Sequence, residues 1–148
     1  LLVRDAMDRV ERLAGVPIAR SSLWRTTPVD CPPGSPVFVN AVVGFPVPDG
    51  WTSTRFLGSL QALEREFGRR PKTVHNEARP LDLDLIVWGD ERRGDAFLTL
   101  PHPRAHERRF VLEPLAEIAP GLRWPGRGES VTELLQCLPP DPAMRRGE

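Results

Sequence analysis

The sequence predicts an α+β sandwich, with helices packed on one face of a mainly antiparallel sheet. Apolar residues recur at helical spacing in two segments, and two largely apolar, extended segments lie between them. The resulting order of helix, strand, strand, helix and strand fits a ferredoxin-like arrangement if one further strand precedes Leu1. We therefore expect a ferredoxin-like sandwich from which this N-terminal strand is missing.

Size and composition indicate one globular domain over residues 1–148, with 40% apolar and 27% charged residues. The formal net charge is zero, whereas general nucleic-acid binders carry a basic excess, so no nucleic-acid partner is expected. No apolar run approaches the ~20 residues of a membrane span, which predicts no membrane partner. Cys31 and Cys137 are too few for a disulfide framework, which predicts two inert thiols in the reducing cytoplasm.

Two segments are predicted as amphipathic helices, Leu1–Leu13 and Thr52–Phe67. In both, apolar residues return every three or four positions and form one face. The second helix has Thr and Ser residues that can cap its start and Gly68 at its end. Two shorter helices are expected at Glu107–Ile118, broken or kinked at Pro114, and at Val131–Leu138.

The predicted sheet contains several strands separated by proline-rich loops. Val37–Val47 is almost entirely apolar and is therefore expected to be central. Leu81–Trp88 alternates apolar and acidic residues in its first half, which is typical of a strand. The remaining predicted strands are Pro17–Arg25 and the short Leu98–Leu100.

The alternating strand carries the strongest chemical signal, a pair of carboxylates. Asp82 and Asp84 are two residues apart, so in a strand both project to the same face. Two carboxylates on one face repel each other, and a Mg²⁺ ion between them and substrate phosphates relieves that repulsion. The alternative is the exposed polar face of an edge strand.

A basic loop, GRRPKTVHNEAR, precedes this strand and contains the chain's only lysine, Lys72. Cations beside paired carboxylates suit phosphoryl transfer, where arginine stabilises the charge that develops on the phosphate. Arg79, three residues before Asp82, is the best candidate, with Arg69 at the start of the loop. The alternative is a solvated loop.

Two further clusters contain candidate binding residues. In LPHPRAHERRF, His102 lies between two prolines, and Arg108 and Phe110 follow it. His102 can contact phosphate, donate a proton or be structural. Asn40 interrupts the apolar strand VFVNAVV, and its amide offers the donor and acceptor that a heteroaromatic edge requires. A backbone partner is the alternative for Asn40.

These clusters, in this order, resemble the family of 6-hydroxymethyl-7,8-dihydropterin pyrophosphokinases of folate biosynthesis. The resemblance spans roughly residues 21–120, through SSLWRTTPV, FVNAVV, LQALEREFGR, ARPLDLDLIVWG and LPHPRAHERRFVLEPLAEIAP. It implies a ferredoxin-like fold and transfer of the β,γ-pyrophosphoryl group of ATP to the hydroxymethyl group of the pterin, releasing AMP. ATP is then a co-substrate, and two Mg²⁺ ions bridge its phosphates.

The resemblance also implies roles at the nucleotide site. Asp82 and Asp84 match the ligands of both Mg²⁺ ions. Arg69 and Arg79 match a mobile catalytic loop that closes over ATP. The matched ATP-binding residues are Glu64, His102 and Arg108.

At the pterin site, the resemblance implies that Asn40 hydrogen-bonds the pterin while Phe38 and Phe110 sandwich its ring. Backbone groups of three further residues, Thr26, Pro28 and Val29, are expected to line the pocket.

Three positions depart from the family's pattern. The N-terminal strand, which ends in a Gly-Ser-Asn turn, is expected just before Leu1. Pro71 stands where the loop usually carries a second arginine, and Asn76 replaces a usual aromatic residue. A catalytically impaired ferredoxin-like binding or interaction domain derived from this family is therefore the alternative function. A third interpretation is one module of a fused folate enzyme.

Overall fold

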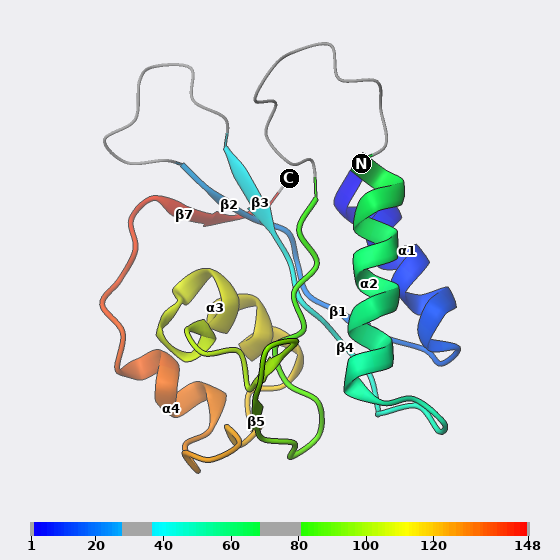
Figure 1. The fold of residues 1–148 in the computed structure, drawn as a ribbon. Helices are drawn as coiled ribbons and strands as arrows, with labels where there is room; N and C mark the ends of the chain where they lie inside the picture. The colour runs from blue at the N-terminus through cyan, green and yellow to red at the C-terminus, as the bar shows by residue number, and fades with distance from the viewer. Residues whose placement is uncertain (1, 28–36, 69–80, 148) are drawn as a thin grey trace.

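The computed structural model describes residues 2–27, 37–68 and 81–147. Its two longest helices, α1 (Leu2–Ala14) and α2 (Ser53–Gly68), pack against each other, and α3 (Arg109–Ile118) packs against α4 (Val131–Gln136). Figure 1 shows the two helix pairs on opposite sides of the strands. A 3-10 turn, η1 (Ala105–Glu107), precedes α3.

The strands are short and all of their pairings are antiparallel within the described residues. Three strands form one sheet, in which β2 (Trp24–Thr26) lies between β3 (Phe38–Asn40) and β7 (Met144–Arg146). Two further pairs join β1 (Ala19–Arg20) to β4 (Val43–Gly44) and β5 (Arg93–Gly94) to β6 (Thr99–Leu100). The predicted mixture of helices and antiparallel sheet is confirmed.

The two predicted strands Pro17–Arg25 and Val37–Val47 pair with each other, but each is divided into two pieces. Where they divide, the Ser21 hydroxyl accepts a hydrogen bond of 2.8 Å from the Val42 N–H. The Ser21 N–H in turn donates to the Val42 carbonyl at 2.9 Å. A side chain that takes a backbone donor competes with the ladder, which accounts for the interruption.

The prediction that Leu81–Trp88 is a strand is wrong in this structure. Figure 1 shows the segment as an extended trace, and no described residue pairs with it in a ladder. Two isolated contacts take the place of a ladder: the Leu83 N–H donates to Glu64, and the Ile86 carbonyl accepts from His102. Alternation fixes which face each side chain occupies, but a strand also needs a neighbouring backbone.

The predicted helices are confirmed with small shifts at their ends. The residues predicted as Glu107–Ile118 form the end of η1 and α3, and α3 runs through Pro114 instead of breaking there. Helix α4 is shorter than predicted, and begins at a capping box in which Ser130 and Glu133 satisfy each other's backbone N–H. Strands β5 and β7 were not predicted.

The core consists of two clusters. The first lies around Phe56 of α2. The centre of the Phe56 ring is 5.1 to 5.4 Å from the ring centres of Phe45, Trp51 and Trp88. The second is centred on Trp124, which is 1% exposed, between α3 and α4. No helix in the described part of the chain is both long and apolar enough to cross a bilayer.

Candidate active site

The paired carboxylates lie on the exposed side of the extended segment, as the alternation predicts. Asp82 and Asp84 are exposed, whereas Leu81 is buried and Leu83 is half-buried. Both carboxylates line a groove of about 960 Å³ between this segment and strands β3 and β4. The extended backbone therefore presents two oxygen-donor groups at one wall of a large cavity.

The same groove is also lined by three of the predicted pterin-binding residues. Phe38 and Asn40 come from β3, and Phe110 comes from α3. Phe38 is 61% exposed, which is unusual for a large apolar ring and leaves its surface free for a ligand. The structure thus brings together Phe38, Asn40 and Phe110 with the two carboxylates along one groove.

His102 is held beside the carboxylates by its own backbone. Its N–H donates a 2.8 Å hydrogen bond to the carbonyl of Ile86, which fixes the turn between the two prolines against the extended segment. Burial lowers the pKa of His102, and the nearby positive charges of Arg108 and Arg104 add to this, while the negative charge of Asp84 opposes it. The lowered pKa favours the neutral imidazole of His102.

The tautomer of His102 follows from one hydrogen bond. The backbone N–H of Arg104 donates to Nδ1 of His102 at 3.3 Å, so Nδ1 carries no proton in this arrangement. The remaining proton is thereby assigned to Nε2, which is left as a donor. Arg108 lies with its guanidinium carbon 5.5 Å from the centre of the Phe110 ring, a cation–π contact that orients it.

Four of the described predicted residues lie outside the lining of the groove, namely His102, Arg108, Glu64 and Thr26. The half-buried carboxylate of Glu64 accepts a hydrogen bond of 2.8 Å from the Leu83 N–H. Thr26, opposite Phe38 in the β2–β3 ladder, has a buried hydroxyl with no hydrogen-bond partner among the described residues. The other predicted residues, namely Pro28, Val29, Arg69 and Arg79 with the departures Pro71 and Asn76, lie outside the described residues.

The carboxylates fit Mg²⁺ better than a metal with a complete protein ligand set. No group of three His, Cys, Asp or Glu side chains that could hold a metal occurs among the residues that the structure describes. Mg²⁺ keeps several waters and is typically held by one or two carboxylates together with substrate phosphates. Asp82 and Asp84, exposed side by side at a groove, meet that requirement.

Sequence reasoning missed the contacts that hold this site. The contact between Glu64 and Leu83 joins a side chain to a backbone N–H 19 positions away, and no residue pattern reports such a contact. The contact of the Arg104 N–H with His102 was easier to predict from the sequence, because Arg104 follows the Pro-His-Pro turn directly. In each case the partner is a backbone N–H, which every residue type except proline supplies.

Comparison with known proteins decides the family. The sequence model of the 7,8-dihydro-6-hydroxymethylpterin-pyrophosphokinase family matches residues 2–120, well over half of the chain. The chain belongs to this family. The predicted family and enzyme class are thereby confirmed.

Bacterial and plant relatives agree with this assignment. A 2-amino-4-hydroxy-6-hydroxymethyldihydropteridine pyrophosphokinase of Synechocystis is 36% identical over 134 residues, which cover 90% of this chain and 67% of the relative. A Pseudomonas aeruginosa protein of the same name is 36% identical over 93% of this chain and 82% of its own length. The mitochondrial folate synthesis bifunctional protein of Arabidopsis thaliana is 35% identical, but the match covers only 20% of it.

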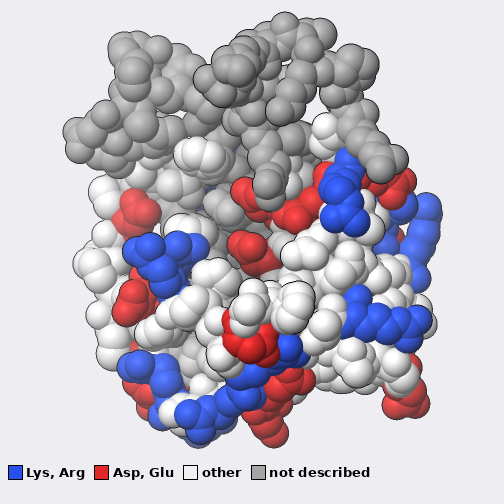
Figure 2. All heavy atoms as spheres, in the orientation of Figure 1, with Lys and Arg blue, Asp and Glu red and all other residues white. Residues whose placement is uncertain are grey.

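The surface charges of this pyrophosphokinase-family chain are mixed. Figure 2 shows basic and acidic side chains of the described residues interspersed over one face, with uncharged residues between them. This distribution agrees with the zero net charge.

Proposed function

We propose that this chain transfers pyrophosphate from ATP to 6-hydroxymethyl-7,8-dihydropterin, giving AMP and the pterin diphosphate in folate biosynthesis. One observation carries the proposal: a single groove is lined by Asp82 and Asp84 and also by Phe38, Asn40 and Phe110. This arrangement offers an oxygen-rich wall for phosphates and an aromatic and amide wall for a flat heterocycle within one groove.

The aromatic wall suits the pterin. Phe38 and Phe110 can stack on the two faces of its ring, and such stacking adds ~0.5–1.5 kcal/mol beyond area burial. Asn40 is half-buried, and its amide can donate and accept at the edge of the heterocycle. Thr26, whose buried hydroxyl has no hydrogen-bond partner among the described residues, lies opposite Phe38 in the same pair of strands and is proposed, with Pro28 and Val29, to complete the pocket.

The acidic wall suits the nucleotide phosphates. We assign Asp82 and Asp84 as the ligands of two Mg²⁺ ions, which would neutralise negative charge on the phosphates when bound. His102 can donate from Nε2 to a phosphate oxygen, and Arg108 supplies a fixed positive charge. We propose that Arg69 and Arg79 close over ATP. Glu64 is proposed to lie near the nucleotide and completes the site.

The chemical step consists of a displacement at phosphorus. The hydroxymethyl oxygen of the pterin attacks the β-phosphorus of ATP, and its proton is released to solvent. The bond between that phosphorus and the oxygen bridging to the α-phosphate breaks, and AMP leaves with this oxygen. The chain's residues mainly position the two substrates and stabilise charge, as is usual for phosphoryl transfer.

We also propose that the domain, residues 1–148, is ferredoxin-like once a further strand lies beside Leu81–Trp88. The groove provides room, because it continues from the Asp82 end toward Trp88 between apolar residues of α1, α2 and β4. The extended segment has no ladder partner among the described residues. The strand that the resemblance places before Leu1 would supply one, and would leave the carboxylate end open to substrates.

The reaction products test this function. The protein with its natural N-terminus, incubated with ATP, the hydroxymethyl-dihydropterin and Mg²⁺, is expected to release AMP and no ADP, as resolved by chromatography. The Asp84→Ala variant, prepared in parallel, controls for contaminating kinases. Release of ADP would contradict the proposal. Binding of both substrates without any AMP would favour the catalytically impaired binding domain.

A further inference from the structure

The strand pair beside the groove changes register where its two halves meet. Arg20 lies opposite Val43 in the β1–β4 ladder, whereas Trp24 lies opposite Asn40 in the β2–β3 ladder. Three residues therefore separate the paired positions on the first strand, but only two separate them on the second. The extra residue forms a β-bulge, a feature that is common beside active sites, where it redirects side chains.

Ser21 holds this bulge through its hydroxyl. In a regular antiparallel ladder, the backbone carbonyl of Ser21 would accept from the Val42 N–H. The hydroxyl accepts that bond instead, at 2.8 Å, while the Ser21 N–H donates to the Val42 carbonyl at 2.9 Å. The same hydroxyl donates to the Ser22 carbonyl at 2.8 Å. Ser21 is only 8% exposed, so little water reaches these contacts.

The bulge turns the first strand from one helix pair to the other. Arg20 and Trp24 are four residues apart and would share a face in a regular strand. Instead, Arg20 donates to Asp8 of α1 at 2.8 Å. Trp24 donates to Glu117 of α3 at 2.7 Å. These two helices lie on opposite sides of the strands in Figure 1, so the strand reverses its faces between Arg20 and Trp24.

The register that follows the bulge decides which side chains lie beside the groove residues of β3. Thr26 lies opposite Phe38, and Trp24 lies opposite Asn40. Without the extra residue, each partner would come one position earlier, so Arg25 would lie opposite Phe38. A charged side chain would then replace Thr26 beside the aromatic ring on which the pterin is proposed to stack.

We propose that Ser21 is a positioning residue for the pterin pocket, an inference that rests on the function proposed above. Its hydroxyl fixes the bulge, and the bulge sets the register of β2 against β3. That register holds Phe38 and Asn40 in the arrangement that the pterin meets. Val42 lines the same groove two positions after Asn40, so loss of its hydrogen-bond acceptor loosens the wall directly.

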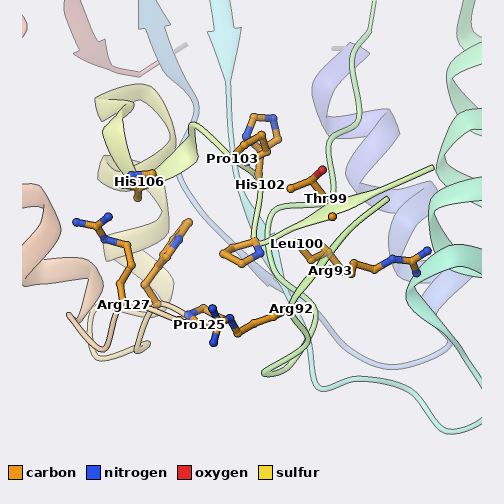
Figure 3. Close-up of a pocket in the computed structure, with 13 residues that line it drawn as sticks. Arg92, Arg93, Thr99, Leu100, His102, Pro103, His106, Pro125 and Arg127 are labelled. Carbon is orange, nitrogen blue, oxygen red and sulfur yellow. The ribbon is translucent and has the colours of Figure 1, made fainter. Parts of the chain in front are cut away.

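The nucleotide side of the site belongs to other elements. Figure 3 shows His102 beside Pro103 in the turn that follows β6. The paired carboxylates lie on the extended segment. The hydrogen bonds of Ser21 lead instead to Val42, in the strand that carries the pterin side. A change at Ser21 is therefore expected to affect the pterin and not ATP, whereas a general loss of structure would affect both substrates.

Steady-state kinetics of AMP release by the protein with its natural N-terminus measure this role. Ser21→Ala is expected to raise the KM for the hydroxymethyl-dihydropterin about tenfold, because the Val42 N–H loses its acceptor. The KM for ATP and kcat are expected to stay within about twofold of the natural values, since the loss is confined to binding of one substrate. Ser21→Thr keeps the hydroxyl and is expected to bring the pterin KM within about threefold of the natural value.

Ser22→Ala is the matched control. It removes the neighbouring hydroxyl, which donates to Glu117 at 2.7 Å, and leaves the contact between Ser21 and Val42 in place. Its pterin KM is expected to stay within about twofold of the natural value, although it loses a comparable hydrogen bond from the same strand. Ser21→Cys, whose sulfur is a weak acceptor, replaces Ser21→Ala if the alanine variant does not fold, and should raise the pterin KM about threefold or more.

The outcomes separate this inference from the proposed function. An unchanged pterin KM in Ser21→Ala, or in Ser21→Cys where it is used, would overturn the positioning role. Equal increases in the KM for both substrates, an equal increase in Ser22→Ala, or no recovery in Ser21→Thr would overturn it as well. A natural protein that releases no AMP contradicts the proposed function, and this inference with it, before any variant is compared.

Discussion

The carboxylate of Glu64 accepts a hydrogen bond of 2.8 Å from the backbone N–H of Leu83, the residue between Asp82 and Asp84. In a sheet, a neighbouring strand's carbonyl would occupy that position. Here a helix side chain takes it, because no described residue pairs with the extended segment in a ladder. Helix α2 therefore fixes the direction in which both carboxylates project.

Replacing Glu64 tests this positioning role. In Glu64→Ala the Leu83 N–H loses an ionised acceptor, so we expect the free energy of unfolding to fall by about 1.5–3 kcal/mol. We also expect a higher Mg²⁺ concentration for half-maximal activity, because the two carboxylates are less well fixed. Urea denaturation and a Mg²⁺ titration measure the two effects.

Two variants serve as controls for Glu64. Glu64→Gln keeps an oxygen acceptor and is expected to retain most of the stability and the Mg²⁺ response. Glu66→Ala removes a carboxylate of the same helix that pairs with Arg9 on the surface. This change should lower the free energy of unfolding by less than ~1 kcal/mol. An equal Mg²⁺ response in Glu64→Ala and the natural protein would contradict the positioning role.

Asp84→Ala is expected to abolish AMP release while leaving the fold intact. Both carboxylates are exposed on the same face, so removing one also removes their mutual repulsion. In the absence of Mg²⁺ the variant should therefore melt at an equal or slightly higher temperature. Circular dichroism melting and an AMP assay check this, with the exposed Asp90→Ala as the control. Normal turnover in Asp84→Ala would exclude Asp84 from the metal site.

The lowered pKa of His102 predicts that the stability of the protein depends on pH. Burial lowers its pKa in the folded protein, so the unfolded chain binds a proton more readily. Stability is then fully present at neutral pH and is lost as the pH falls below about 6.5, where the unfolded histidine begins to titrate. Urea midpoints measured from pH 7.5 to 5 should fall less steeply for His102→Asn. Identical slopes for both proteins would contradict this assignment.

Glu117 of α3 is expected to stabilise the first half of the sheet. Its carboxylate accepts hydrogen bonds from the Ser22 hydroxyl at 2.7 Å and from Nε1 of Trp24 at 2.7 Å. Glu117→Ala leaves both donors without this acceptor, which should lower the free energy of unfolding by about 1–3 kcal/mol. Glu113→Ala, one turn earlier on the same helix, is the control. Urea denaturation that gives equal losses for both variants would count against this contact.

Local sequence patterns predicted the helices and strands whose formation depends on nearby residues. The apolar repeat of α2 placed Phe56, Leu60, Leu63 and Phe67 on one face. The first three are buried, and Phe67 is half-buried against the same core. Helical periodicity works here because each apolar stripe can face only one neighbour. The first two strands were also predicted, but the Ser21 hydroxyl that divides them was not.

Non-local contacts could not be predicted in the same way. Strand β7 joins Met144–Arg146 to residues more than a hundred positions earlier, and its sequence has no alternation that indicates a strand. The alternation of Leu81–Trp88 correctly placed Asp82 and Asp84 on the exposed side but did not provide a partner strand. A ladder depends on two backbones meeting, which a single segment does not encode.

The sequence alone determined the family and the helices, because motifs and periodicity are properties of neighbouring residues. Only the tertiary structure showed that Phe38, Asn40 and Phe110 share one groove with Asp82 and Asp84. It also supplied the contacts that hold the carboxylates and His102. These features join backbone groups and side chains far apart in the chain, so they arise only when the chain folds.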